Sequence, residues 1–214
     1  MIKLENISKS YQTPRKRIDV LKNIDLEIRD KGIFIVFGPS GIGKTTMLNL
    51  IGGMDKPTSG RILIDGSDIA ELGHDQLANL RKEKIGFIFQ SFNLLPHLSA
   101  KDNILLPALL DKDLDKKRKN VDGLASELGI KARLSHLPHE LSAGEQQRVT
   151  IARAMINSPS IILADEPTAD LDDENAKKII DILKGLNQKN GCTVVIATND
   201  ERLAQQFPAR FDLK

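Results

Sequence analysis

The sequence predicts an α/β protein with a parallel-sheet core, an N-terminal antiparallel β subdomain and an inserted α-helical subdomain. Apolar runs separated by helical patterns recur at residues 33–37, 85–89, 161–164 and 193–198. Such continuous runs are typical of parallel strands that are buried on both faces. Residues 2–7 and 20–28 instead alternate apolar and polar positions around a turn-rich stretch, 12–19, which indicates an antiparallel flap. Residues 91–156 carry only helical patterns, which indicates a helical insertion.

These patterns divide one domain, residues 1–214, into three regions. The antiparallel β subdomain takes residues 1–31 and about 61–69, the core takes 32–60, 70–91 and 157–214, and the helical subdomain takes 92–156. Within the helical region we expect helices at 102–110, at 114–128 and from about Ala143 onward. Residues 62–64 are expected to join the antiparallel sheet.

Composition narrows the function classes. Charged residues make up 28% of the chain but the net charge is only +2, so nucleic acid is not the expected partner. The longest apolar runs are too short to span a bilayer, no signal peptide is visible, and the single cysteine, Cys192, is expected to be a packed residue at a strand start. We therefore expect a cytoplasmic protein.

Two other patterns are weak. His136 and His139 lie three residues apart, without a cysteine or acidic partner at metal spacing, so a zinc site is not expected. The charged run at 111–119 is interpreted as a solvated helix start, with contact to anionic lipid or to a partner as the alternative.

The strongest motif is Gly-Pro-Ser-Gly-Ile-Gly-Lys-Thr at residues 38–45, directly after a predicted buried strand. It fits the phosphate-binding pattern G-x-x-x-x-G-K-[ST], in which backbone N–H groups and a helix N-terminus surround phosphate oxygens. Lys44 would reach the β- and γ-phosphates of a nucleoside triphosphate, and the Thr45 hydroxyl would hold Mg²⁺. The alternative is a glycine-rich turn with an incidental lysine, which the preceding strand disfavours.

Two adjacent carboxylates, Asp165 and Glu166, end the apolar run that begins at residue 161. Because consecutive strand residues point to opposite faces, the two can take different roles. Asp165 suits the Mg²⁺ shell, and Glu166 suits the base that deprotonates a water in line with the γ-phosphate.

A third motif, Leu-Ser-Ala-Gly-Glu-Gln-Gln at residues 141–147, places Ser142 and Glu145 at capping-box spacing. A helix is expected to begin here with Ser142 as its N-cap. That feature is ordinary by itself, but a serine hydroxyl, a glycine backbone and a helix N-terminus also form a second anion site.

Together these motifs resemble the ATP-binding-cassette (ABC) family, over nearly the whole chain. Residues 38–45 resemble its Walker A loop, 141–146 its signature motif, and 161–166 its Walker B strand. Residues 87–90 are similar to its Q-loop and 169–172 to its D-loop. The resemblance implies a P-loop NTPase core and two subunits that close head to tail around ATP, with the signature helix of one copy capping the γ-phosphate held by the other.

The resemblance also assigns individual roles. Gln90 would touch Mg²⁺ or the attacking water, and Tyr11, which could otherwise be flap packing, would stack on adenine. The residues expected to contact nucleotide are Tyr11, Gly38, Pro39, Ser40, Gly41, Ile42, Gly43, Lys44, Thr45, Thr46, Ser142, Gly144, Glu145, Gln146 and Asp172. Those expected at Mg²⁺ are Thr45, Gln90 and Asp165, and the catalytic set is Glu166, Gln90 and Asn199.

Further implications concern partners. ATP and Mg²⁺ are the expected cofactors, and the expected partners are a second copy or a paralogous subunit together with a transmembrane permease, without nucleic acid. The chain would then lie on the inner face of the membrane. Residues 12–20 and 90–104 resemble the branch that serves lipoprotein release, macrolide export and bacteriocin or peptide efflux, but neither stretch selects the cargo.

The chain departs from the family at Asn199, where a histidine is usual. An asparagine cannot carry positive charge or shuttle a proton, so an ATP-dependent clamp with slow hydrolysis is the alternative function. A cassette acting on nucleic acid or ribosomes is disfavoured by the absence of basic arms, and a small GTPase by the absence of N-K-x-D. Ala143 replaces the first signature glycine, and the chain stops at Lys214, where relatives usually continue, so we expect a terminal extension to be missing.

Overall fold

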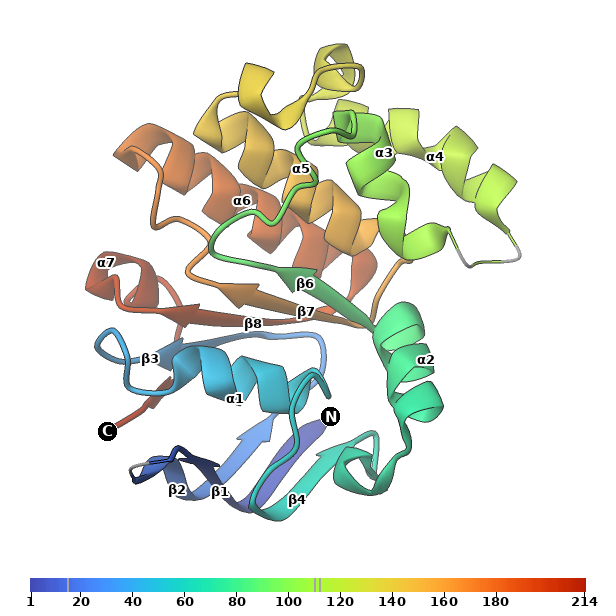
Figure 1. Cartoon of the computed structure of the whole chain (residues 1–214). Helices are drawn as coiled ribbons and strands as arrows, with labels where there is room; N and C mark the ends of the chain where they lie inside the picture. Colours follow the sequence, from blue (N-terminus) through green and yellow to red (C-terminus); the bar gives the residue numbers. More distant parts are fainter. Residues whose placement is uncertain (15, 110, 112) are drawn as a thin grey trace.

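The computed structural model describes residues 1–14, 16–109, 111 and 113–214. It contains two sheets with helices on both sides of the larger one (Figure 1). Buried side chains form two clusters, one on each face of that sheet. The predicted fold class is confirmed. No helix in these described ranges is both long and apolar enough to cross a membrane.

The larger sheet is parallel and has the strand order β6-β7-β8-β3-β9. Its strands are β6 (Ile85–Ile88), β7 (Ile161–Asp165), β8 (Thr193–Thr198), β3 (Ile33–Phe37) and β9 (Arg210–Asp212). All four predicted strands are present, but β6 ends one residue earlier and β7 one residue later than predicted. The sequence did not predict β9, because this three-residue edge strand has one apolar side chain, Phe211, and so no visible apolar run.

Helices cover both faces of the parallel sheet. They are α1 (Lys44–Ile51), α2 (His74–Lys84), α5 (Ala143–Met155), α6 (Asp173–Asn190) and α7 (Glu201–Ala204). Helices α5 and α6 pack on one face, while α1 lies between the other face and the antiparallel sheet (Figure 1). Cys192 is buried directly before β8, as the sequence predicted.

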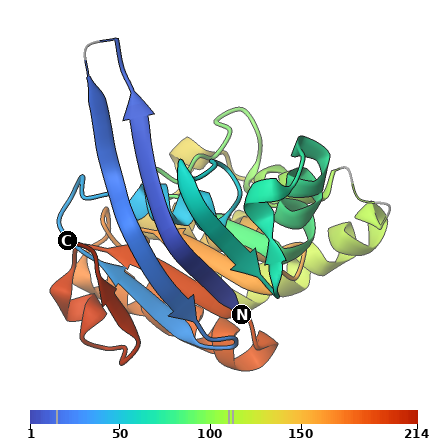
Figure 2. The ribbon, with the colours of Figure 1, turned by 90° about the horizontal axis from the view of Figure 1, so that it is seen from below.

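The antiparallel sheet has the order β2-β1-β4-β5. Its strands are β1 (Ile2–Gln12), β2 (Arg17–Ile28), β4 (Ser59–Ile64) and β5 (Ser67–Asp68). The stretch at 12–19 was expected to be turn, but β2 already begins at Arg17 because Gln12 pairs with Arg17 and Tyr11 with Ile18. The hairpin therefore extends past the rest of the sheet (Figure 2). Residue 15, inside the predicted insert, is outside the described residues.

The helical region contains α3 (Ala100–Leu105), α4 (Leu114–Glu127) and α5, and no strand occurs in the described residues between 91 and 156. The first helix was predicted at 102–110. It begins earlier because the Ser99 hydroxyl accepts the Asp102 N–H, and it tightens into the 3₁₀ turn Leu106–Ala108 at Pro107. Residue 110 is outside the described residues, as is residue 112 of the charged run. Further 3₁₀ turns occupy Ile69–Glu71, Lys131–Arg133 and Pro138–Glu140.

Candidate functional site: a nucleotide pocket at the end of the parallel sheet

The predicted phosphate loop connects the buried strand β3 to the N-terminus of α1 (Figure 1). Gly43, the residue before the helix, has φ +113°, and a side chain there would come within 2.8 Å of Val20. Gly41 has φ +79° and faces open space. Both positions therefore need glycine, one for close approach to β2 and both for backbone conformation.

Lys44 is buried at the base of this loop, with 5% of its side chain exposed. Its ammonium donates to the carbonyls of Gly38 at 2.9 Å and Pro39 at 3.1 Å, and it forms an ion pair with Glu166 Oε1 at 3.1 Å. The lysine is thus held at the loop by its own chain, in a position from which phosphate oxygens could replace these partners.

Asp165 and Thr45 form the second part of the site. The Thr45 hydroxyl donates to Asp165 Oδ2 at 2.6 Å, across 120 positions of sequence. Asp165 Oδ1 is buried with no hydrogen-bond partner among the described residues. Burial raises the pKa of Asp165 and the neighbouring Glu166 carboxylate raises it further, while the Thr45 hydrogen bond opposes both. A hydroxyl and a carboxylate with an unused oxygen are hard oxygen ligands, so these residues fit Mg²⁺.

Glu166 turns the chain at the end of β7. Its φ is +44°, an uncommon value for a residue with a side chain, and its N–H donates to the Ala197 carbonyl at 2.9 Å. The carboxylate lies between Lys44 and the backbone N–H of Asn199, which donates to Oε2 at 3.2 Å. Strained backbone of this kind is often found at functional sites.

Lys44, Thr45 and Glu166 line one pocket of about 280 Å³, and Asp165 contacts Thr45 without lining the pocket itself. Its walls are Val20, Ser40, Gly41, Gly43, Lys44, Thr45, Thr46, Gln90, Glu166, Ala169 and Asn199. The structure therefore brings together the phosphate loop and all three predicted catalytic residues, although what they bind stays a prediction. Val20 was not predicted, and Ala169 was placed in the D-loop but not in the pocket wall, because a small or β-branched apolar residue gives no chemical signal in the sequence.

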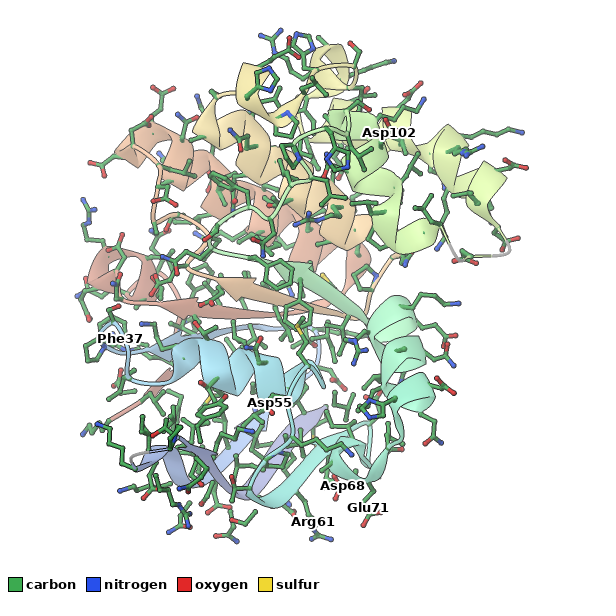
Figure 3. All side chains as sticks on the ribbon, in the orientation of Figure 1. Phe37, Asp55, Arg61, Asp68, Glu71 and Asp102 are labelled. Carbon is green, nitrogen blue, oxygen red and sulfur yellow. The ribbon has the colours of Figure 1, made fainter. Side chains whose placement is uncertain are left out.

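Tyr11 lies on the projecting hairpin and does not line this pocket. Its hydroxyl donates to Asp55 Oδ2 at 2.8 Å, and Lys9 Nζ lies 4.7 Å from its ring centroid (Figure 3 labels Asp55 in the turn after α1). Burial and the Asp55 hydrogen bond raise the pKa of Tyr11. Tyr11 is still 40% exposed, so part of its surface is accessible.

The signature residues lie elsewhere. Ser142 caps α5 by accepting the Glu145 N–H, and Glu145 accepts the Ser142 N–H at 2.9 Å, which confirms the predicted capping box. Arg133 also binds the Glu145 carboxylate and lowers its pKa. Within the described part of the chain, none of Ser142, Gly144, Glu145 and Gln146 lines the pocket.

Gly144 and Asp172 both contact the N-terminal end of α6. A side chain at Gly144 would come within 2.9 Å of Asn175 Oδ1, so α5 packs directly on the start of α6. Asp172 caps α6 by accepting the Asn175 N–H at 2.8 Å. Its predicted contact with nucleotide stays a prediction.

A phosphate loop between a parallel strand and a helix, with two carboxylates at the end of a nearby strand, defines a nucleoside triphosphatase of the P-loop class. The comparisons narrow this class. The ABC transporter family model matches residues 21–169, and the chain belongs to this family. It is an ABC ATPase.

Relatives match over almost the whole chain. An uncharacterized ABC transporter ATP-binding protein, MJ0796 of Methanocaldococcus jannaschii, is 44% identical over 96% of this chain and 89% of its own length. The lipoprotein-releasing system ATP-binding protein LolD of Legionella pneumophila is 41% identical over 95% and 90%. The macrolide export ATP-binding/permease protein MacB of Bdellovibrio bacteriovorus is 44% identical over 96% of this chain but only 31% of its own length.

Solved structures agree with this assignment. A dimeric structure of MJ0796 superposes with a TM-score of 0.91 at 42% identity, covering 100% of this chain and 94% of that one. A dimeric post-hydrolysis state of the same cassette, bound to ADP and Pi, superposes with a TM-score of 0.88. Because this similar cassette has been captured after hydrolysis, the comparison does not favour the alternative function, an ATP-dependent clamp with slow hydrolysis.

Proposed function

We propose that this chain is the ATP-hydrolysing subunit of an export-type transporter of the LolD and MacB kind, in which two copies close head to tail around ATP beneath a separate permease. The observation that supports the proposal is the separation of the two surfaces that are predicted to bind anions. The pocket around Lys44 is open, and the Ser142 end of α5 lies outside it. A second copy could supply the missing wall.

Nucleotide binding would begin with an exchange of partners at Lys44. Its ammonium now binds the Gly38 and Pro39 carbonyls and Glu166. Phosphate oxygens would take over these hydrogen bonds, while N–H groups of residues 39–46 surround the phosphate chain. This exchange would release the Glu166 carboxylate for a water molecule.

The metal ligands would be Thr45, Asp165 and Gln90. When bound, Mg²⁺ would neutralise charge that develops between the β- and γ-phosphates. The unused Asp165 Oδ1 supports this assignment, since a buried carboxylate oxygen otherwise lacks compensation.

Hydrolysis would use Glu166 as the general base. Its carboxylate would accept a proton from water as the water oxygen bonds to the γ-phosphorus and the bond to the ADP oxygen breaks. The backbone N–H of Asn199 would keep the carboxylate aimed, because it already binds Oε2. The exposed Asn199 side chain would donate an amide hydrogen bond where the family usually places histidine.

The partner copy would complete the pocket. Its Ser142 hydroxyl, the N–H groups around Gly144 and the Gln146 side chain would face the γ-phosphate, with Asp172 of the D-loop at the same interface. The Glu145 carboxylate would stay bound to the Ser142 N–H and to Arg133 and so hold this end of the helix in shape. Tyr11 would stack on adenine with its free ring face. The hydrogen bond to Asp55 supports this role because it fixes the ring direction.

The experiment is reconstitution with a permease of the same host. We expect the chain to co-purify with an integral membrane protein and to hydrolyse ATP faster in the complex than alone. The matched control is Lys44→Met, which should bind the same protein without the gain in rate. Recovery with ribosomes or nucleic acid, and with no membrane protein, would contradict the proposal.

A further inference from the structure

Gln90 lies in a tight turn whose shape depends on the residues after it. The Phe92 N–H donates to the Phe89 carbonyl at 3.3 Å, which closes a four-residue turn around Gln90 and Ser91. Phe92 and Asn93 then both adopt left-handed backbone, with φ +55° and +51°. Two consecutive non-glycine residues in this region are costly, so surrounding contacts must hold them.

Arg153 supplies those contacts from α5. Its guanidinium donates from Nη2 to the Phe92 carbonyl at 2.6 Å and from Nη1 to the Asn93 carbonyl at 2.5 Å. The residue is only 8% exposed, and no carboxylate forms an ion pair with it in the described ranges. Burial lowers the pKa of Arg153, since nothing negative compensates its charge. A buried arginine directed only at backbone carbonyls acts as a structural clamp.

We infer that Arg153 is a positioning residue that sets the direction of Gln90 in the nucleotide pocket by holding the left-handed pair Phe92–Asn93 against α5. This inference rests on the function proposed for Gln90. On the N-terminal side, Gln90 is fixed by strand β6, and on the C-terminal side by this clamp. Loss of the clamp would let the turn relax and move Gln90 away from the metal and the water.

Helix α5, which carries Arg153, also contacts the segment that follows Glu166. Arg153 sits near the C-terminal end of α5, whose N-terminal end carries Ser142. Gln147 of the same helix donates to the Pro167 carbonyl at 2.9 Å, immediately after Glu166. Helix α5 thus contacts the segment after Gln90 through Arg153 and the segment after Glu166 through Gln147. Because a second copy would contact the N-terminus of the same helix, a shift of α5 would move Gln90 and Glu166 together.

The test compares steady-state ATP hydrolysis by the full chain and its variants. Arg153→Met should lower kcat by about 100-fold and leave KM within threefold, because a misplacement of about 1 Å costs rate more than binding. Arg153→Lys keeps the charge but cannot reach both carbonyls in one plane, so it should also be slow. The matched control is Arg81→Met, which removes a half-buried arginine that donates to the Gly53 carbonyl at 2.7 Å, away from the pocket. Its kcat should stay within twofold.

Two combinations separate positioning from folding. Asn93→Gly in the Arg153→Met background should recover rate several-fold, since glycine adopts positive φ without strain. Arg153→Met should cost little further rate in a Gln90→Ala background, because both changes remove the same contribution. A thermal melt of each variant identifies any that fail to fold, and for these the comparison uses Arg153→Lys.

The outcomes are distinct. Rates of Arg153→Met and Arg153→Lys within twofold of the parent would overturn the inference, as would effects of Arg153→Met and Gln90→Ala that multiply. If Gln90→Ala leaves kcat unchanged, the role proposed for Gln90 is wrong. If Gln90→Ala is slow while the Arg153 variants are fast, the proposed function stands and only the clamp is wrong.

Discussion

Replacing Glu166 by glutamine separates two roles of this carboxylate. The change keeps the shape of the side chain but removes the base and the charge that Lys44 now contacts at 3.1 Å. At this separation the Coulomb attraction is about 5 kcal/mol for an effective dielectric constant of ~20, before the cost of desolvating both groups. A charged hydrogen bond contributes a net ~1.5–3 kcal/mol, and the glutamine oxygen would retain ~0.5–1.5 kcal/mol.

The Lys44 contact is therefore weaker in the variant by ~1–1.5 kcal/mol. Because phosphate oxygens must replace this contact when ATP binds, the same free energy is added to the affinity for ATP. We therefore expect Glu166→Gln to bind ATP roughly 5- to 12-fold more tightly. Loss of a general base should lower the hydrolysis rate by ~10²- to 10⁴-fold. The variant should then accumulate as an ATP-bound dimer.

The assay is single-turnover hydrolysis together with light scattering in the presence of ATP. The matched control is Glu174→Gln, in which an exposed carboxylate paired with Lys178 loses its charge outside the pocket. This control should hydrolyse ATP at the parental rate. If Glu166→Gln also hydrolyses at that rate, Glu166 is not the base and the mechanism is wrong.

Three further changes test other parts of the pocket. Asn199→His should raise the single-turnover rate of ATP hydrolysis by up to ~10²-fold, because it places a cationic donor beside the charge that develops on the γ-phosphate. Equal rates for the parent and the variant would show that Asn199 does not slow hydrolysis. Asp165→Asn should raise the Mg²⁺ concentration that ATP binding requires, since an amide in contact with Thr45 is a weaker metal ligand than a carboxylate. Titration of Mg²⁺ at fixed nucleotide checks this, and an unchanged midpoint contradicts it. Tyr11→Leu should raise the KM for ATP several-fold at constant kcat. Tyr11→Phe, which loses only the Asp55 hydrogen bond, should raise this KM less. Equal values of KM for the parent and both variants would exclude stacking of Tyr11 on adenine.

Much of the fold follows from local sequence because parallel strands buried on both faces are continuous apolar runs. That signal located β3 and β8 to the residue. The contact between Thr45 and Asp165 follows from the same reasoning, since the carboxyl ends of parallel strands meet at one edge of the sheet.

Other features depend on tertiary packing and leave no local signal. The strand β9 is too short for a pattern, and the length of the β1–β2 hairpin is set by cross-strand pairing. The role of Arg153 has no local signal in the sequence, because its partners are carbonyls 60 and 61 positions away. Only the folded chain shows the clamp.

The central claim is a pocket shared between two copies, and intermolecular cross-linking tests it most directly. The chain has one cysteine, Cys192, which is buried, so a cysteine at Ser40 in one copy and at Ala143 in another would be the reactive pair. In the Glu166→Gln background, a mixture of Ser40→Cys and Ala143→Cys chains with a short bifunctional thiol reagent should form an ATP-dependent dimer band. A mixture that stays monomeric while ATP is bound would contradict a pocket completed by a second chain.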